Sequence, residues 1–440
     1  MICCGKLPKR IIIFTCLIAV FGITIAFLSI IGLDSVLIDP KEVSLIGTIP
    51  VALLAFSVGG LVVIVCARSM LEEGLIVFLL LFSLELAFAM VTGISYHHDD
   101  EQWLHRWAIE VIQGERSGWD YSFFLAGLYG LFGTNLMVGK VLNGLTTALL
   151  PFLVFRIART IFPEGRVPRT SFYWCCLSIP LLLYGAFSLK ESLTAFFLTA
   201  AIGGLALAKR HALTGCGVAI GLTFILTALR PVYAGILVPA IVVYLLSPDS
   251  CGNRSDARWL MLTTIFASSF FLANSILSGM DSRFSTNYLE QLQQRQTFAG
   301  QIFTSTDTLN PSNILIASIA GIYSPPPIRL LLGIGNVLES ITMLTWYVIV
   351  PFFVLGTLNA SPSPIKNAIA STVLIGSLVA SISLVFAGVS DRHRIPLLPL
   401  MCIFAGNGHN TMTQRRWFYV WWASIFVFNF LYWYMRASFA

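Results

Sequence analysis

The sequence predicts an all-α, polytopic membrane protein with about thirteen transmembrane helices, and three observations lead to this fold class. Hydrophobic residues make up 57% of the 440 residues, and the mean hydropathy is +0.82. Charged residues account for only 11%, against about 25% in a soluble domain. The apolar residues also fall in long runs. Soluble globular, disordered and nucleic-acid-binding classes are therefore excluded, and helices are expected because they satisfy their own backbone hydrogen bonds in lipid.

A helix needs about 20 apolar residues to cross the hydrocarbon core of a bilayer. The candidate segments are 11–33, 45–67, 75–94, 136–158, 171–188, 192–208, 212–229, 231–247, 259–279, 337–358, 367–387, 395–408 and 417–435. The first is too long and too uniformly apolar for a cleaved signal peptide, so we expect a retained anchor. The twelfth is short and contains two prolines, which makes its bounds the least defined.

The distribution of charge predicts which connecting segments are cytoplasmic, because these are enriched in Lys and Arg. With the N-terminus inside, the cytoplasmic segments hold 15 basic and 5 acidic residues, whereas the outer segments hold 11 basic and 15 acidic residues. Lys140 and Glu85 fall within spans. All nine cysteines fall in spans or on the cytoplasmic side, so no disulfide framework is expected. We predict a multi-pass protein of the plasma (inner) membrane with a cytoplasmic N-terminus and an outer C-terminus.

The first long outer loop, residues 95–135, contains an amphipathic pattern. Trp103, Trp107 and Val111 recur at every fourth position, which predicts a helix that lies in the membrane interface. A second apolar piece, residues 123–132, is too short to span the bilayer and is expected to lie at the same surface. The loop therefore predicts interfacial helices.

The second long outer loop, residues 280–336, is rich in Gln, Ser and Thr and contains three consecutive prolines at 325–327. The prolines are expected to hold their stretch extended. Two interpretations stay open for this loop. It is either a solvated connector or a cover over a substrate site, because loops of this length are commonly functional.

Ionisable residues collect at the outer ends of the predicted spans. They are Asp99, Asp100, Glu101, Lys190, Arg230, Arg392 and Arg394. A carboxylate at this depth can act as general base toward an acceptor hydroxyl, and Arg and Lys can stabilise a phosphate leaving group. A polyprenyl phosphate carries its phosphate at the same depth, so the combination favours sugar transfer from a lipid-phosphate donor. The competing interpretation is that the basic side chains only anchor the spans at the interface.

The order of motifs extends this hypothesis. The acidic run 99–101 follows a span directly, an interfacial helix comes next, and the run 128–133 leads into the following span. Lys190-Glu191 begins a later span, and residues 391–399 read Asp-Arg-His-Arg-Ile-Pro-Leu-Leu-Pro. This layout resembles the GT-C superfamily of integral-membrane glycosyltransferases, which includes aminoarabinose transferases and protein O-mannosyltransferases (family 39). The resemblance covers about residues 75–408 and is closest to members associated with surface polysaccharide synthesis.

The resemblance implies a function and a set of roles. The expected reaction is an inverting transfer of a sugar from a polyprenyl-phosphate donor to a lipid-linked or surface-glycan acceptor on the extracytoplasmic side. The implied catalytic residues are Asp100, Asp99 and Glu101, and the implied donor-phosphate ligands are Arg392, Arg394, Lys190 and Arg230. The Asp100-Glu101 order favours Asp100 as the base. The aromatic residue found four positions after the family's aspartate is Trp103 if the base is Asp99, so both assignments stay open.

The resemblance also implies a division of the chain into an N-terminal two-span extension (1–74), a catalytic core (75–408) and a C-terminal span (409–440). The extension departs from the family, which usually has one span before the acidic motif. Some relatives use a divalent metal and others do not, and His97 and His98 are the candidate ligands here. No other cofactor motif is present.

Three other functions fit a chain of this composition. A lipid-linked oligosaccharide flippase would need polar residues through the middle of its spans, where only Glu85 and Lys140 are candidates. An oligosaccharide polymerase or ligase also has many spans and large outer loops. A catalytically inactive assembly subunit is the third alternative. The expected partners are membrane lipids, the lipid-linked donor and a glycan or lipid acceptor, with no nucleic acid.

Overall fold

The computed structural model describes residues 45–95, 99–116, 120–163, 165–247, 334–387, 391–410, 419–427 and 430. Every regular element within these ranges is a helix, which confirms the predicted all-α class for this part of the chain. The predicted spans 11–33 and 259–279 lie outside the described residues, as do residues 280–333 of the second long loop.

The helices vary widely in length. In chain order they are α2 (Leu45–Cys66), η1 (Arg68–Met70), α3 (Leu71–Ser95), α4 (Asp99–Ile112), α5 (Tyr121–Phe132), α6 (Leu136–Ile161), α7 (Val167–Cys176), α8 (Ile179–Gly185), α9 (Lys190–Ala208), α10 (Ala212–Leu229), α11 (Pro231–Leu246), α16 (Ile334–Asn359), α17 (Pro364–Ala387), η3 (Asp391–Leu397) and α18 (Leu398–Asn410). Six of the described helical segments are long and apolar enough to cross a membrane. The chain is therefore a helical membrane protein, and the total of thirteen spans stays a prediction.

Helix α2 exposes large apolar side chains on its surface. Leu54, Leu61 and Val65 are exposed, with Val65 retaining 73% of its accessible surface. A row of large apolar side chains on one helix would be costly in water but is favourable against lipid. The burial pattern thus agrees with the membrane location that the composition predicts.

The predicted span 171–188 is not one helix, which corrects the sequence prediction. It divides into α7 and α8, with a break at Leu177 and Ser178. Pro180 lies two residues beyond the break, and proline has no backbone N–H with which to continue a helical ladder. Neither helix, of 10 and 7 residues, is long enough to cross a bilayer alone.

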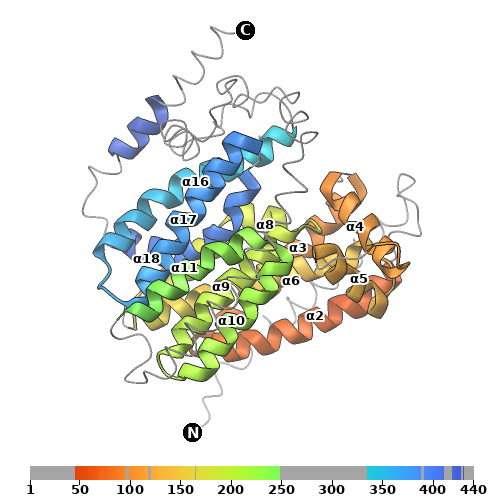
Figure 1. The fold of residues 1–440 in the computed structure, drawn as a ribbon, viewed down its shortest axis with the longest axis horizontal. Helices are drawn as coiled ribbons and strands as arrows, with labels where there is room; N and C mark the ends of the chain where they lie inside the picture. The colour runs from red at the N-terminus through yellow and green to blue at the C-terminus, as the bar shows by residue number, and fades with distance from the viewer. Residues whose placement is uncertain are drawn as a thin grey trace, which may run out of the picture. The chain divides into compact units, whose positions relative to one another are not determined.

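The chain forms two compact units. Unit 1 contains the described residues up to Leu153 together with Leu181–Phe196, and unit 2 contains Val154–Pro180 and the described residues from Phe197 onward. Within unit 1, α2 packs on α3, where a Cβ atom at Gly59 would overlap the ring of Phe78. The amphipathic helix α4 lies beside α5 (Figure 1).

Unit 2 is built on a close pair, α16 and α18. Gly356 of α16 lies against the carbonyl of Phe404, and the side-chain amide of Asn407 donates a hydrogen bond of 2.8 Å to the carbonyl of Gly356. α11 packs on α17 (Figure 1). α7 packs on the same helix α18, and η3 contacts α17 just before α18 begins. This packing places η3, which begins with the basic segment 391–394, against α16, α17 and α18.

Candidate functional site

The acidic run predicted to carry catalysis forms the first turn of α4. Asp99, Asp100 and Glu101 are the first three residues of this helix. The carboxyl groups of Asp99 and Asp100 lie outside the described side chains, whereas the side chain of Glu101 is fully buried. The helix ends at Ile112, and Gly114 follows with a φ of 75°, a left-handed conformation that suits glycine at a helix end.

The two faces of α4 have different surroundings. Leu104 and Ala108 are buried, whereas Trp103 keeps 52% of its surface exposed. Two guanidinium groups lie over indole rings. The guanidinium carbon of Arg106 is 5.4 Å from the ring centroid of Trp103, and that of Arg116 is 4.1 Å from the ring centroid of Trp107. A face of Trp and Arg side chains is typical of a helix at a membrane interface, so the structure agrees with the amphipathic pattern of the sequence.

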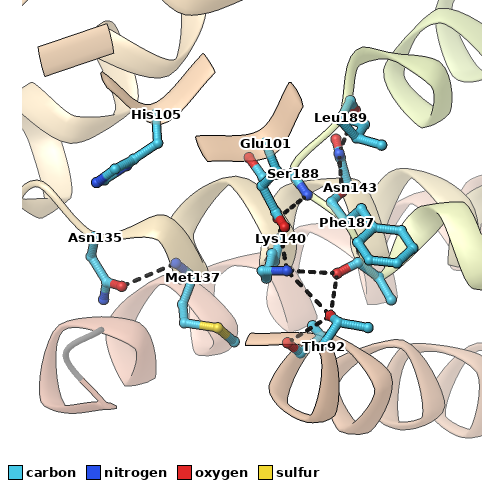
Figure 2. A network of polar contacts seen from close by, with 12 residues as sticks. Thr92, Glu101, His105, Asn135, Met137, Lys140, Asn143, Phe187, Ser188 and Leu189 are labelled. Atoms are coloured by element: carbon cyan, nitrogen blue, oxygen red, sulfur yellow. Dashed lines mark hydrogen bonds and ion pairs between the residues drawn. The ribbon is translucent and has the colours of Figure 1, made fainter. Parts of the chain in front are cut away.

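Glu101 forms an ion pair with Lys140 of α6 inside unit 1 (Figure 2). The Nζ atom of Lys140 lies 2.7 Å from Oε1 of Glu101, and both side chains are fully buried. The same Oε1 accepts a hydrogen bond of 2.6 Å from the backbone N–H of Ser188. The ion pair compensates the two buried charges. It also attaches the first turn of α4 to α6.

The contacts of Lys140 extend to α3 and to the segment after α8. Its ammonium group donates to Oγ1 of Thr92 at 3.2 Å and to the carbonyl of Ala186 at 3.4 Å (Figure 2). Thr92 in turn donates to the carbonyl of Ala186 at 3.2 Å. One lysine therefore joins α3, α4, α6 and the start of the α8–α9 connection.

The α8–α9 connection, residues 186–189, is a buried backbone segment that is not helical. Buried carbonyl groups outside a helix need partners, especially in a membrane protein. The side-chain amide of Asn143 supplies two of them, with Nδ2 at 2.6 Å from the carbonyls of both Phe187 and Leu189 (Figure 2). Polar side chains of α6 thus hold this connection in place.

Lys140 was predicted only to lie within a span, and no role was predicted for Asn143. A signal was present, because the two residues are three positions apart in an otherwise apolar span and therefore share one helix face. Intramembrane polar residues commonly mark a functional or internally paired site. Their partners include backbone carbonyls more than 40 residues away in sequence, which periodicity does not reveal.

Helix α5 is attached to the same region through Tyr121. Its hydroxyl lies 3.4 Å from Oγ of Ser188. Burial raises the pKa of Tyr121 above its ordinary value near 10, so the phenol stays protonated at neutral pH. Between the two helices, Nδ1 of His105 in α4 is hydrogen-bonded to the hydroxyl of Tyr129 in α5 at 2.8 Å. Polar contacts thus join α5 both to Ser188 and to α4.

The predicted donor-phosphate residues divide between the two units. Arg230 precedes α11, and its Nη1 atom donates to Nδ1 of His393 in η3 at 2.7 Å. The hydroxyl of Tyr233 also donates to the carbonyl of His393. Arg394, the next residue, is 2% exposed. The structure therefore brings Arg230 and the segment 393–394 together within unit 2.

Arg394 is held among apolar and sulfur-containing groups. Its Nη1 atom lies 2.8 Å from Sδ of Met343, and its guanidinium carbon lies 5.2 Å from the ring centroid of Trp346. The side chain of Arg392 lies outside the described residues, and Lys190 begins α9 within unit 1. A buried, stacked guanidinium differs from the flexible interfacial anchor considered as the alternative.

The predicted metal ligands His97 and His98 lie outside the described residues. Across the described part of the chain, no group of three or more His, Cys, Asp or Glu side chains is placed to hold a metal ion. The possible divalent metal therefore stays a prediction.

Comparisons with known proteins found no match for this chain among family models, curated proteins or solved structures.

Proposed function

We propose that this membrane protein is a glycosyltransferase that moves a sugar from a polyprenyl-phosphate donor to a lipid-linked or surface-glycan acceptor on the extracytoplasmic side. The observation that carries the proposal is the buried Glu101–Lys140 pair, which fixes the first turn of the helix that begins Asp99-Asp100. Catalytic groups need a rigid support of this kind, because small displacements of a general base greatly reduce its effect.

The proposed reaction uses a carboxylate of this turn as general base. Asp100 takes the proton of the acceptor hydroxyl, whose oxygen then forms a bond to the anomeric carbon of the donor sugar. The bond between that carbon and the phosphate oxygen breaks, and its electron pair leaves with the phosphate. Attack from the face opposite the phosphate inverts the anomeric configuration. In this scheme Glu101 is a positioning residue, because its charge is already bound to Lys140.

The arginine cluster of unit 2 supplies the second part of the proposal. Arg230 is hydrogen-bonded to His393, and Arg394 is the next residue in the sequence. An arginine has no acceptor atom, so Nδ1 of His393 accepts from Arg230 and leaves the N–H on Nε2 when the ring is neutral. Guanidinium groups suit the planar recognition of phosphate oxygens. Together with Arg392, they are the proposed ligands of the leaving phosphate in unit 2, and the role of Lys190, which belongs to unit 1, stays a prediction of the sequence.

A lipid-linked oligosaccharide flippase is the main alternative. It needs polar side chains that line a path. In the described part of the chain, Lys140 instead forms an ion pair with Glu101 and hydrogen bonds to Thr92 and a backbone carbonyl. These contacts join helices and do not line a path. This arrangement favours a transferase over a flippase, and it does not separate a transferase from a polymerase or ligase.

The proposal is tested with purified protein in liposomes that contain a radiolabelled polyprenyl-phosphate sugar. Candidate acceptors come from lipid extracts of cells that lack the gene, where the unmodified acceptor is expected to accumulate. Transfer of label to a larger lipid-linked product supports the proposed function. Movement of the labelled lipid between leaflets without a new glycosidic bond would instead support the flippase.

The proposed orientation is tested by cysteine labelling. In a background without the native cysteines, a Ser117→Cys variant is expected to react with a membrane-impermeant thiol reagent added outside intact cells. A Ser255→Cys variant is expected to react only after the membrane is opened. This result follows from the charge distribution, since Ser117 falls in a predicted outer loop and Ser255 in a basic cytoplasmic one. The reverse pattern would contradict the extracytoplasmic site.

The phosphate role is tested by arginine-to-lysine substitution. We expect Arg392→Lys and Arg394→Lys to raise the donor concentration needed for half-maximal transfer by about tenfold, because lysine keeps the charge but lacks the planar fork. Arg210→Lys, at an exposed turn between α9 and α10, is the matched control and should leave donor use unchanged. If both lysine variants match the parent over the whole donor range, the arginines have no part in binding the phosphate.

A further inference from the structure

A second buried carboxyl group lies inside unit 1, and the proposed reaction does not use it. Glu85 belongs to α3, within the apolar segment Arg68–Met90, and its side chain is 0% exposed. Neither carboxyl oxygen has a hydrogen-bond partner among the described residues. An intramembrane carboxyl group is costly to bury, so its surroundings should show what offsets the cost.

The described groups that are placed beside Glu85 at Gly144 and Gly185 carry no charge. Its Cβ atom lies 3.0 Å from where a Cβ would stand on Gly144 of α6, so the two helices are in close contact there. Its Oε2 atom lies 2.5 Å from the corresponding point on Gly185, at the end of α8, and Oγ1 of Thr147 lies 2.6 Å from that same point. The hydroxyl of Thr147 is likewise buried without a hydrogen-bond partner in the described part of the chain. Two unpartnered polar groups thus meet at one glycine.

The nearest cation along α6 is committed elsewhere. Lys140 lies four residues before Gly144, but its ammonium group binds Oε1 of Glu101 at 2.7 Å and forms no ion pair with Glu85 among the described contacts. On α8, Tyr184 stands next to Gly185, and a tyrosine side chain carries no positive charge in either protonation state. Glu85 therefore differs from Glu101, whose ionised form is compensated by a lysine and a backbone N–H.

We propose that Glu85 is a proton-binding site in the membrane interior, where the side chain is held as a neutral carboxylic acid. An ionised carboxylate with neutral neighbours in an apolar interior is strongly disfavoured. The protonated form removes the charge and gains an O–H donor, for which the buried hydroxyl oxygen of Thr147, beside the same glycine, offers an acceptor. The proton comes from water when the protein folds, and no other bond changes. This inference is independent of the glycosyltransferase proposal.

The first test uses Glu85→Gln, because glutamine has the shape and the neutral charge of a protonated glutamate. If Glu85 is neutral, the melting temperature of the variant in detergent is expected to equal that of the parent. The two are expected to be equal both in sodium chloride and in choline chloride at the same ionic strength. Glu101→Gln is the matched control, and it should melt at a clearly lower temperature because it leaves Lys140 unpaired. A loss of stability in Glu85→Gln as large as in the control would overturn the proposal.

The second test is chemical. Dicyclohexylcarbodiimide reacts with a protonated carboxyl group in apolar surroundings, taking its proton and forming an O-acylisourea that rearranges to a stable N-acylurea. In membranes treated with this reagent, peptide mass spectrometry is expected to find the adduct on Glu85 and not on Glu101. Labelling of Glu101 but not Glu85 would contradict the proposal. Protection of Glu85 by sodium but not by choline would also contradict it, because it would identify a metal-cation site instead.

Discussion

Replacing Lys140 with methionine is expected to lower the free energy of unfolding by about 3–5 kcal/mol, because it leaves the buried Glu101 carboxylate without its counter-charge. Glu101→Gln should have an effect of similar size, since it leaves the Lys140 ammonium group unpaired and weakens the bond to Ser188 N–H. The measurement is denaturant or thermal unfolding of the purified protein in detergent. Both variants should also lose transfer activity, because the first turn of α4 is no longer fixed.

The control for this prediction is the double variant Glu101→Gln with Lys140→Met. It removes both charges together, so its loss of stability should be smaller than the sum of the two single losses. Glu115→Gln, at an exposed position just beyond α4, should leave the stability unchanged. If the two single losses simply add in the double variant, the two side chains do not act as a pair.

Replacing Asp100 with asparagine is expected to reduce the rate of sugar transfer by a factor of about 100 or more, which is the usual contribution of a positioned general base. The substitution keeps the shape and hydrogen-bonding capacity of the side chain but removes the base. The stability of the protein should stay unchanged, in contrast to the neighbouring Glu101→Gln. The measurement is the initial transfer rate at saturating donor in liposomes, alongside the unfolding curve of the same preparation.

Asp99→Asn is the matched control for this substitution, because it removes a carboxylate one residue earlier in the same helical turn. A larger loss of rate in Asp99→Asn than in Asp100→Asn would assign the base to Asp99. Normal rates in both variants would remove the catalytic role from this motif while leaving the positioning contact of Glu101 with Lys140 intact.

The contrast between these two experiments depends on the geometry of one helical turn. Asp100 and Glu101 are adjacent in sequence and chemically similar, yet the structure gives Glu101 a buried partner on α6. Loss of stability and loss of catalysis are therefore expected to separate between neighbouring residues. Measuring both quantities on each variant distinguishes a catalytic residue from a positioning residue.

Composition and hydropathy were sufficient to predict the class of the protein. The described elements are all helices, and segments such as α10 (Ala212–Leu229) and α11 (Pro231–Leu246) end within a residue of their predicted bounds. The amphipathic helix of the first long loop was also predictable, because its Trp residues recur with the helical period. These features depend on the free energy of transferring each side chain from water to an apolar phase. That free energy is set by the residue type and can therefore be read from the sequence.

The contacts of the candidate site were decided only by the tertiary structure. Lipid-facing and protein-facing positions of a membrane helix are both apolar, so hydropathy does not show which side of α6 packs inside unit 1. The partner of Lys140 is Glu101, 39 residues earlier, and the amide of Asn143 binds carbonyls of the α8–α9 connection. The sequence by itself determined that these polar residues lie within or beside apolar helices. Packing alone decided that one carboxylate is neutralised by a lysine while Glu85 has no hydrogen-bond partner among the described residues, because pairing depends on distances between segments that are remote in the chain.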